Sequence, residues 1–445
     1  MTRDRNRFDG ALAALVLLDL GAVTFSLLSF SMRGIGFGPY HIDLDVYRIG
    51  GQTWLHHGDL YGPLPATQAG LRLPFSYPPI AAVLLAPLSL LPMPAAGALF
   101  SLATVALTAV VLRVFLAAAW PAARPSWRTV GWLLPAALLL EPVRNTISYG
   151  QVNVLLMALV AADCLAPGTR WPRGALVGLA AAVKLTPGAF VLFFLLRRDY
   201  RAARTAALSF CVTTAAGFLL APRDSARYWT SVIFQTGRPG SPVYAANQSI
   251  QGVLARAGLD PHTAAGLALW LALCAVTVLL AVRGMRHAID RGLDAWAVSL
   301  NAFAALLVSP VSWSHHWVWG ETAMLVLACR GLRAPRGAQR RVVLASAVAG
   351  TALFAVAPQW WLPHAGDREL HWAAWEQLAG SGYVLLASAV LAVSAAGSRR
   401  TAGDVPGDVA VSPDSGDSRA PSPAGSRQTV TVSAASRPAR SLRVS

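Results

Sequence analysis

Two carboxylates, Asp43 and Asp45, stand one residue apart in the polar stretch HIDLDVYRIGGQTWLHHGDLYG. In an extended chain they would point the same way, whereas in a helix they diverge by roughly 200° and cannot easily share one ligand. A carboxylate beside an apolar surface resists ionisation and becomes a better proton acceptor near neutral pH. The pair therefore predicts one general base acting on a hydroxyl, and two solvated loop acids are the alternative.

Two adjacent histidines, His315 and His316, lie in the motif SWSHHW. Because imidazole titrates near physiological pH, one of them could donate to a phosphate oxygen or orient an acceptor hydroxyl. The neighbouring Trp313, Trp317 and Trp319 also suit anchoring at a membrane interface. Both interpretations follow from the residues alone.

Two cations could meet an anion. Arg144 precedes the segment GQVN, which contains Gln151 and Asn153, and a fixed guanidinium matches a phosphate leaving group. An ordinary interfacial arginine is the alternative. Lys184 stands alone among alanines and leucines, which is costly in a membrane unless the side chain snorkels to the surface or meets an anion.

The composition shows which elements must position these groups. Of 445 residues, 55% are hydrophobic and only 13% are charged, and the mean hydropathy is +0.49. Apolar runs that suit a hydrocarbon layer of about 30 Å alternate with short basic or proline-rich breaks. The alternation of a membrane β-barrel is absent, so the spans are expected to be helical. No Gly-rich phosphate loop, zinc-ligand spacing or Ser-His-Asp signature appears, which argues against a soluble nucleotide site.

The distribution of Lys and Arg predicts the orientation of the chain. The net charge is +16, but the cations cluster in loops that the positive-inside rule assigns to the cytoplasm. We attribute them to topology and to contact with anionic membrane lipid, not to nucleic acid. We therefore expect an all-α, multi-pass protein of the cell membrane with about 10–12 transmembrane helices, outer-face loops and both termini in the cytoplasm.

Three segments depart from simple spans. Residues 11–32 are expected to form an uncleaved signal anchor, because the apolar run is too long for a signal peptide. Residues 78–92, short and rich in proline, predict a re-entrant or interfacial helix at the outer face. A break at residues 184–187 predicts an elbow between two helices that dip into the membrane. We expect residues 1–396 to form the membrane-embedded domain and the Ser/Pro-rich residues 397–445 a disordered cytoplasmic tail.

This topology gathers the polar clusters on one side. The clusters around Asp43, Gln151, Asn247 and His315 all fall on the extracytoplasmic side, while the basic loops occupy the other. Such convergence is what an extracytoplasmic active site requires.

Several stretches, in this order, resemble the membrane-embedded GT-C glycosyltransferases of family GT87, which are polyprenyl-phosphate-mannose-dependent α-(1→2)-mannosyltransferases. The resemblance covers about residues 11–396 and leaves only the tail outside. It is carried by DLDVYRIGG with HGDLYG, FSYPPIAAVLLAPLSLLP, GQVNVLLMAL, GLAAAVKLTPGAFVL, NQSIQGVLAR and SPVSWSHHWVW. It implies a GT-C-like helical bundle for the membrane domain.

The resemblance also implies roles for residues. The family pattern Asp-Leu-any-Val-Tyr falls on Asp43 as the catalytic base, with Asp45 as the second choice, and SW-x-HH implies that His315 or His316 assists. The substrate-binding residues expected from the matched stretches and their surroundings are Tyr77, Arg144, Gln151, Asn153, Lys184, Asn247 and Gln248.

The chemistry implied is transfer of mannose, with inversion, from polyprenyl-phosphate-mannose to a hydroxyl of a lipid-linked glycan or glycolipid acceptor. Because the lipid donor carries its own phosphate leaving group, no cofactor is expected, and the sequence shows no convincing metal cage. Two alternatives stay open: a transporter or flippase of lipid-linked sugar, and a GT-C transferase of another polyprenyl-linked sugar such as arabinofuranose.

Overall fold

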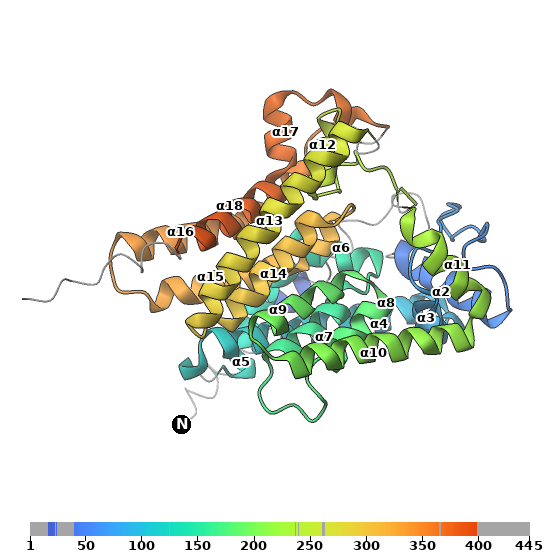
Figure 1. The fold of residues 1–445 in the computed structure, drawn as a ribbon, viewed down its shortest axis with the longest axis horizontal. Coiled ribbons are helices and arrows are strands. Elements are labelled where there is room, and N and C mark those ends of the chain that lie inside the picture. The colour runs from blue at the N-terminus through green and yellow to red at the C-terminus, as the bar shows by residue number, and fades with distance from the viewer. Residues whose placement is uncertain are drawn as a thin grey trace, which may run out of the picture. The chain divides into compact units, whose positions relative to one another are not determined.

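The computed structural model describes residues 17–22, 24, 40–123, 125–235, 237–238, 240–259, 263–364 and 366–397. Regular structure in these ranges is helical, apart from one isolated bridge between Asn247 and Trp313. The all-α prediction is therefore confirmed for the part of the chain that the structure describes (Figure 1). Most of the predicted signal anchor, and residues 398–445 of the predicted tail, lie outside these ranges.

The helices vary widely in length. The α-helices are α2 (Ile42–Leu55), α3 (Pro79–Leu85), α4 (Met93–Ala119), α5 (Trp127–Leu138), α6 (Glu141–Tyr149), α7 (Asn153–Leu165), α8 (Ala175–Val183), α9 (Val191–Leu196), α10 (Tyr200–Leu220), α11 (Pro222–Thr230), α12 (Ile250–Arg256), α13 (Ala264–Asp290), α14 (Asp294–Val308), α15 (Trp319–Arg333), α16 (Ala338–Val356), α17 (Ala374–Gly380) and α18 (Gly382–Ala396). The 3₁₀ helices that matter for the site are η1 (Ala86–Leu90), η3 (Thr186–Phe190) and η5 (Ser314–Val318).

Among the described residues, four helices are long and apolar enough to cross a membrane: α4, α10, α13 and the helix Ala338–Trp360. Two bent pairs, α6 with α7 and α17 with α18, raise that number to six if each pair is one span. The sequence-based count of about 10–12 is larger because it includes segments that form shorter apolar helices, such as Asp294–Val308.

The bend between α6 and α7 brings polar residues back toward α2. Gly150 ends α6 in the left-handed conformation with φ 70°, and the two helices then diverge by 120°. A Cβ at Gly150 would lie 2.6 Å from Cβ of Leu44 in α2, so only glycine fits this close approach. The turn therefore positions Gln151 beside the first turn of α2.

The predicted break at Lys184 is present. Asp163, fully buried in α7, accepts hydrogen bonds of 2.9 Å from the N–H groups of Gly174 and Val177 and so fixes the start of α8. The helix ends at Lys184, which is extended (φ −150°, ψ 127°), and η3 follows with Pro187 near its start. The break exposes the Lys184 side chain to the space between α7 and η5.

The longer helices pack against one another around these elements. α4 packs against α7 and α15, while α13 packs against α14 and α18, and α8 lies along α10 (Figure 1). η5 packs against α6, α7 and α15. Small residues such as Gly178, where a Cβ would meet the backbone of α10 at 2.2 Å, permit the closest of these contacts.

Candidate active site

The carboxylate of Asp43 lies in the first turn of α2, partly buried at a cavity wall. Its Oδ2 accepts a hydrogen bond of 2.7 Å from Nε2 of Gln151. Burial raises the pKa of Asp43 to about 6, although the Gln151 bond and the charge of Lys184 both act to lower it. A carboxylate with this pKa is ionised at neutral pH and is still basic enough to accept a proton.

Two tyrosines fix the orientation of the Gln151 amide. Oε1 of Gln151 accepts from the phenol of Tyr47 at 2.8 Å and from that of Tyr77 at 3.3 Å, and the two phenol oxygens lie 2.9 Å apart. Because phenols occupy the amide oxygen, the amide NH₂ must face Asp43. The network thus holds a donor, not an acceptor, against the carboxylate.

Asp45 points away from this network. Its Oδ2 accepts from the phenol of Tyr40 and from the N–H of Gln68, both at 2.8 Å, and its Oδ1 lies 3.5 Å from a guanidinium nitrogen of Arg48. Arg48 in turn donates to the carbonyl of Leu91 at 2.7 Å. The Asp45 carboxylate therefore ties α2 to the segment after η1, and helical geometry separates it from Asp43.

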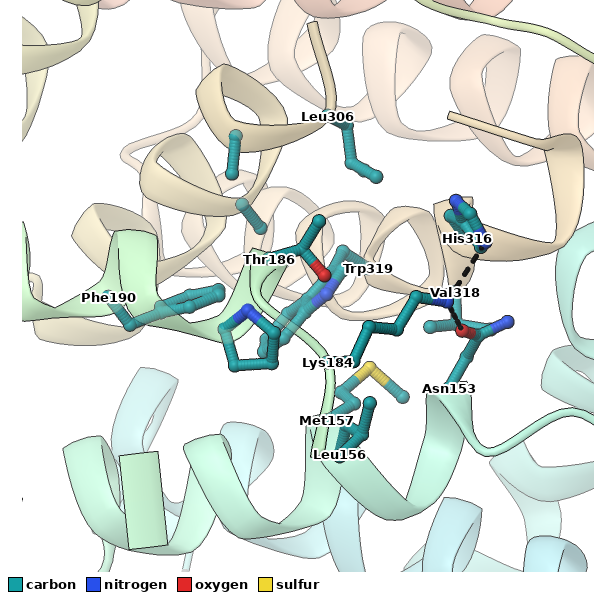
Figure 2. Close-up of a pocket in the computed structure, with 13 residues that line it drawn as sticks. Asn153, Leu156, Met157, Lys184, Thr186, Phe190, Leu306, His316, Val318 and Trp319 are labelled. Atoms are coloured by element: carbon teal, nitrogen blue, oxygen red, sulfur yellow. Dashed lines mark hydrogen bonds between the residues drawn. The ribbon is translucent and has the colours of Figure 1, made fainter. Parts of the chain in front are cut away.

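Lys184 reaches a histidine and an asparagine. Its Nζ lies 3.0 Å from Oδ1 of Asn153 and 3.0 Å from Nε2 of His316, as Figure 2 shows. An ammonium group only donates, so Nε2 of His316 accepts and the proton of the neutral ring sits on Nδ1. The ammonium also lies 5.5 Å from the centre of the Tyr77 ring.

His315 lies beside this cluster with its ring buried. Its main-chain carbonyl accepts from Nδ2 of Asn153 at 2.8 Å and from the hydroxyl of Thr146 at 3.1 Å, which anchors η5 to α6 and α7. The ring packs edge-on against Tyr149 at 5.4 Å. Both ring nitrogens are buried, and neither has a hydrogen-bond partner among the described residues.

Two cavities meet at Asp43 and His315. One, of about 340 Å³, is also lined by Tyr77, Lys184 and Arg238. The other, of about 330 Å³, is also lined by the aromatic residues Tyr149, Tyr244 and Trp360. A carboxylate shared by two cavities is arranged to act between two ligands, one of which would face a cluster of cations.

Five predicted site residues do not line either of these cavities: Asp45 and Asn153, described above, and Arg144, Asn247 and Gln248. Arg144 is half-buried in α6, close enough to Glu141 for their charges to interact. Asn247 and Gln248 are fully buried: Asn247 donates to the carbonyl of Pro242 at 3.0 Å, and Gln248 donates to that of Gly380 at 2.7 Å. The NH₂ groups of both amides donate to main-chain carbonyls, and both side chains are buried away from the two cavities.

Sequence reasoning missed other residues of the cavity walls. Arg238 extends its guanidinium over the ring of Tyr61 and donates to the carbonyl of Tyr61 at 3.0 Å. Tyr47, Trp313 and Trp360 also line the two cavities. Tyr47 belongs to the quoted DLDVY motif. Arg238 stands in an expected outer loop and Trp360 at the end of an expected span, and neither has a spacing signal.

Comparison with known proteins gives a family match. The profile of Glycosyltransferase family 87 matches residues 75–310. This range contains Tyr77, Gln151, Lys184 and Arg238, while Asp43 and the histidines lie outside it.

Similarity to characterised relatives extends over most of the chain. A polyprenol-phosphate-mannose-dependent α-(1-2)-phosphatidylinositol mannoside mannosyltransferase of Mycobacterium tuberculosis is 42% identical over 378 residues, covering 81% of this chain and 86% of that protein. The protein of the same name in Mycolicibacterium smegmatis is 41% identical, covering 81% and 85%. A polyprenol-phosphate-mannose-dependent α-(1-2)-phosphatidylinositol pentamannoside mannosyltransferase of M. tuberculosis is 34% identical, covering 65% and 67%. No solved structure matches the chain.

Proposed function

The chain belongs to glycosyltransferase family 87, and from this premise we propose that it transfers mannose from polyprenol-phosphate-mannose to a hydroxyl of a phosphatidylinositol mannoside. The relatives that are 42% and 41% identical are named for this donor, this acceptor and an α-(1-2) linkage. The reaction takes place at the extracytoplasmic face, because the basic loops occupy the other side under the positive-inside rule.

Asp43 is the general base of an inverting displacement. The acceptor oxygen forms a bond to C1 of the mannose while the bond from C1 to the phosphate oxygen breaks, and polyprenyl phosphate leaves with that electron pair. The Asp43 carboxylate takes the hydroxyl proton. A β-linked mannosyl phosphate thereby becomes an α-mannoside.

The cations that line the cavity of about 340 Å³ stabilise the departing phosphate. Lys184, held at 3.0 Å by both Asn153 and His316, and Arg238, held by main-chain carbonyls, present positive charge on the cavity that also contains Asp43. Charge that is fixed before the reaction stabilises a developing phosphate without further reorganisation.

One observation carries the proposal: a single carboxylate with a raised pKa lies at the wall common to two cavities, with a lysine nearby on one side. Asp45 cannot replace it, because Tyr40, Gln68 and Arg48 already occupy its oxygens. Asn247 and Gln248 act by positioning, since they join the outer loop to the segment that precedes His315.

Transfer in isolated membranes tests the function. Membranes that contain the protein receive polyprenyl-phosphate-mannose and a phosphatidylinositol mannoside, and the initial rate of transfer is measured. Asp43→Asn should lower that rate by about 10²- to 10⁴-fold, the usual contribution of a general base. Asp59→Asn is the matched control, because this acid is exposed and pairs with Arg227 instead.

Each contrary outcome has a distinct meaning. Equal transfer by Asp43→Asn contradicts the assignment of the base. Transfer from a polyprenyl-phosphate-arabinose donor alone contradicts mannose as the sugar. Movement of a lipid-linked sugar across the bilayer without transfer from any donor contradicts an enzyme and favours a transporter.

A further inference from the structure

The cavity of about 330 Å³ has a wall that is unlike that of its neighbour. Four aromatic residues line it: Tyr149, Tyr244, Trp313 and Trp360, all half-buried, so their rings are partly open to the cavity. Small-molecule sites typically have volumes of about 300–1,000 Å³ and combine apolar or aromatic walls with a few placed polar groups. The space is therefore large enough, and of the right kind, to hold part of a substrate.

The aromatic rings are held in place by their neighbours. Tyr244 packs edge-on against Trp313 at 6.1 Å and against Trp360 at 5.9 Å. The indole N–H of Trp360 donates to Oε1 of Glu141 at 2.6 Å, and the other oxygen of this buried acid accepts from the phenol of Tyr383 at 2.8 Å. Because the ring of Trp360 is fixed in advance, little entropy is lost when a ligand packs on it.

The charged groups differ between the two cavities. Asp367 and Glu369 line the aromatic cavity, and Glu369 is held by the N–H of Ala245 at 3.0 Å. Lys184 and Arg238 line the other cavity. Carboxylates repel a phosphate but accept hydrogen bonds from the hydroxyls of a neutral sugar, so a phosphate is favoured on the cationic side and an uncharged sugar on the acidic side.

We propose that the aromatic cavity binds the terminal mannose of the acceptor, with Trp360 as the platform for the C–H face of the sugar ring and Asp367 as a hydrogen-bond acceptor for its hydroxyls. This inference rests on the proposed function, since it assumes that mannose enters from a lipid-phosphate donor in the cationic cavity. Asp43 lies at the wall shared by the two cavities, where the acceptor hydroxyl and C1 of the donor meet.

Two other tryptophans, Trp361 and Trp375, differ from Trp360 in their exposure. Trp361 is 78% exposed and Trp375 is 64% exposed, as expected for rings at a membrane interface. Trp360 is instead half-buried and bonded to a fully buried acid. Trp361 therefore provides a control that differs from Trp360 by one position in the chain.

The test is a comparison of KM values for the two substrates, with phosphatidylinositol mannoside as the acceptor and polyprenyl-phosphate-mannose as the donor. Trp360→Leu should raise the acceptor KM about tenfold, because an anchoring aromatic platform is lost, and leave the donor KM within about twofold. Trp360→Phe should recover most of the acceptor affinity, because a flat ring is retained. Both variants lose the bond to Glu141, so the comparison isolates the ring.

Three further variants complete the design. Trp361→Leu should leave both KM values unchanged. Arg238→Gln should raise the donor KM and leave the acceptor KM unchanged, since it lines only the cationic cavity of the two. Asp367→Asn, which fits the backbone because asparagine accepts the φ of 56° found there, should raise the acceptor KM several-fold even if the Trp360 variants fail to accumulate.

The outcomes separate the inference from the proposed function. If the wild type transfers mannose but Trp360→Leu and Asp367→Asn leave the acceptor KM unchanged, or raise the donor KM equally, the acceptor cavity is contradicted while the function stands. If the wild type transfers no mannose from this donor, the proposed function itself is contradicted.

Discussion

Nε2 of Gln151 donates a hydrogen bond of 2.7 Å to Oδ2 of Asp43, across 108 positions of the chain. The amide belongs to the turn between α6 and α7, and the carboxylate belongs to the first turn of α2. Tyr47 and Tyr77 occupy the amide oxygen, so the bond to Asp43 has a fixed direction. A donor held in this way favours the ionised carboxylate, which is the form that a general base requires.

The pH dependence of the wild type should follow Asp43. Its pKa of about 6 is raised by burial. Because the base acts when it is deprotonated, kcat/KM should be constant near neutral pH and should fall about tenfold per pH unit once the pH is well below 6. The charged or titratable groups that also line its cavities include Lys184, Arg238 and His315. A pH profile that stays flat down to pH 4.5 would contradict Asp43 as the base.

Replacing Gln151 by leucine should move the acid limb of the pH profile, the fall of kcat/KM at low pH, to higher pH. Without the amide donor, the ionised form of Asp43 loses a bond that lowers its pKa, so the carboxylate takes up its proton at higher pH. A hydrogen bond to a charged group contributes about 1.5–3 kcal/mol, which corresponds to an upward shift of roughly 1–2 pH units and to about a two- to fifteenfold loss of rate at pH 7. Gln52→Leu, an exposed glutamine of α2, is the control and should leave the profile unchanged.

Replacing Lys184 by methionine should also raise the pKa of Asp43, because the positive charge of Lys184 acts to lower it. The acid limb should therefore shift to higher pH, and the donor KM should rise because a phosphate loses its cation. Lys184→Arg keeps the positive charge and should show a smaller change in both the acid limb and the donor KM. An acid limb that is identical in Lys184→Met and the wild type would show that the two side chains do not interact.

Asp45→Asn should affect stability more than chemistry. The substitution weakens the bonds from Tyr40 and Gln68 and removes the ion pair with Arg48. We expect a loss of about 1–3 kcal/mol in the free energy of unfolding, seen as a lower melting temperature in detergent. The acid limb of kcat/KM should keep its position. An Asp45→Asn protein with normal stability and a rate as low as that of Asp43→Asn would reverse the two roles.

The sequence predicted the helical class, the break at Lys184 and several residues that the structure brings together. Asp43, Gln151, Lys184 and His316 were separate motifs in the sequence, and the periodicity of a helix already indicated that only one of the two aspartates would face a ligand. Which aspartate faces the cavity depends on the direction from which α6 and α7 approach α2. That direction is set by tertiary packing and has no local signal.

The remaining site residues could not be predicted for physical reasons. Asn247 and Gln248 look like ligand-binding amides, but both are fully buried and their NH₂ groups donate to main-chain carbonyls. Arg238 occupies a loop whose composition suits any outer surface, and Trp360 ends an apolar segment, where a tryptophan also suits a membrane interface. Their place at the cavity walls depends on tertiary contacts: Glu141 fixes the Trp360 indole, and main-chain carbonyls fix the Arg238 guanidinium.

Gly150 should tolerate alanine less well than another glycine with a similar backbone. Gly150 has φ 70° and a Cβ there would lie 2.6 Å from Cβ of Leu44, whereas Gly168 has φ 58° and open space around it. Gly168→Ala should cost about 1 kcal/mol through left-handed strain alone. Gly150→Ala adds a clash with α2, so its melting temperature should fall further.

Gly150→Ala should also reduce the rate of mannose transfer, because any shift of the turn moves Gln151 away from Asp43. Misplacement of a catalytic group by about 1 Å can lower a rate roughly a hundredfold. Thermal unfolding and mannose transfer, measured on both variants in one detergent, check the prediction. Equal losses in Gly150→Ala and Gly168→Ala would show that the contact between this turn and α2 does not position the base.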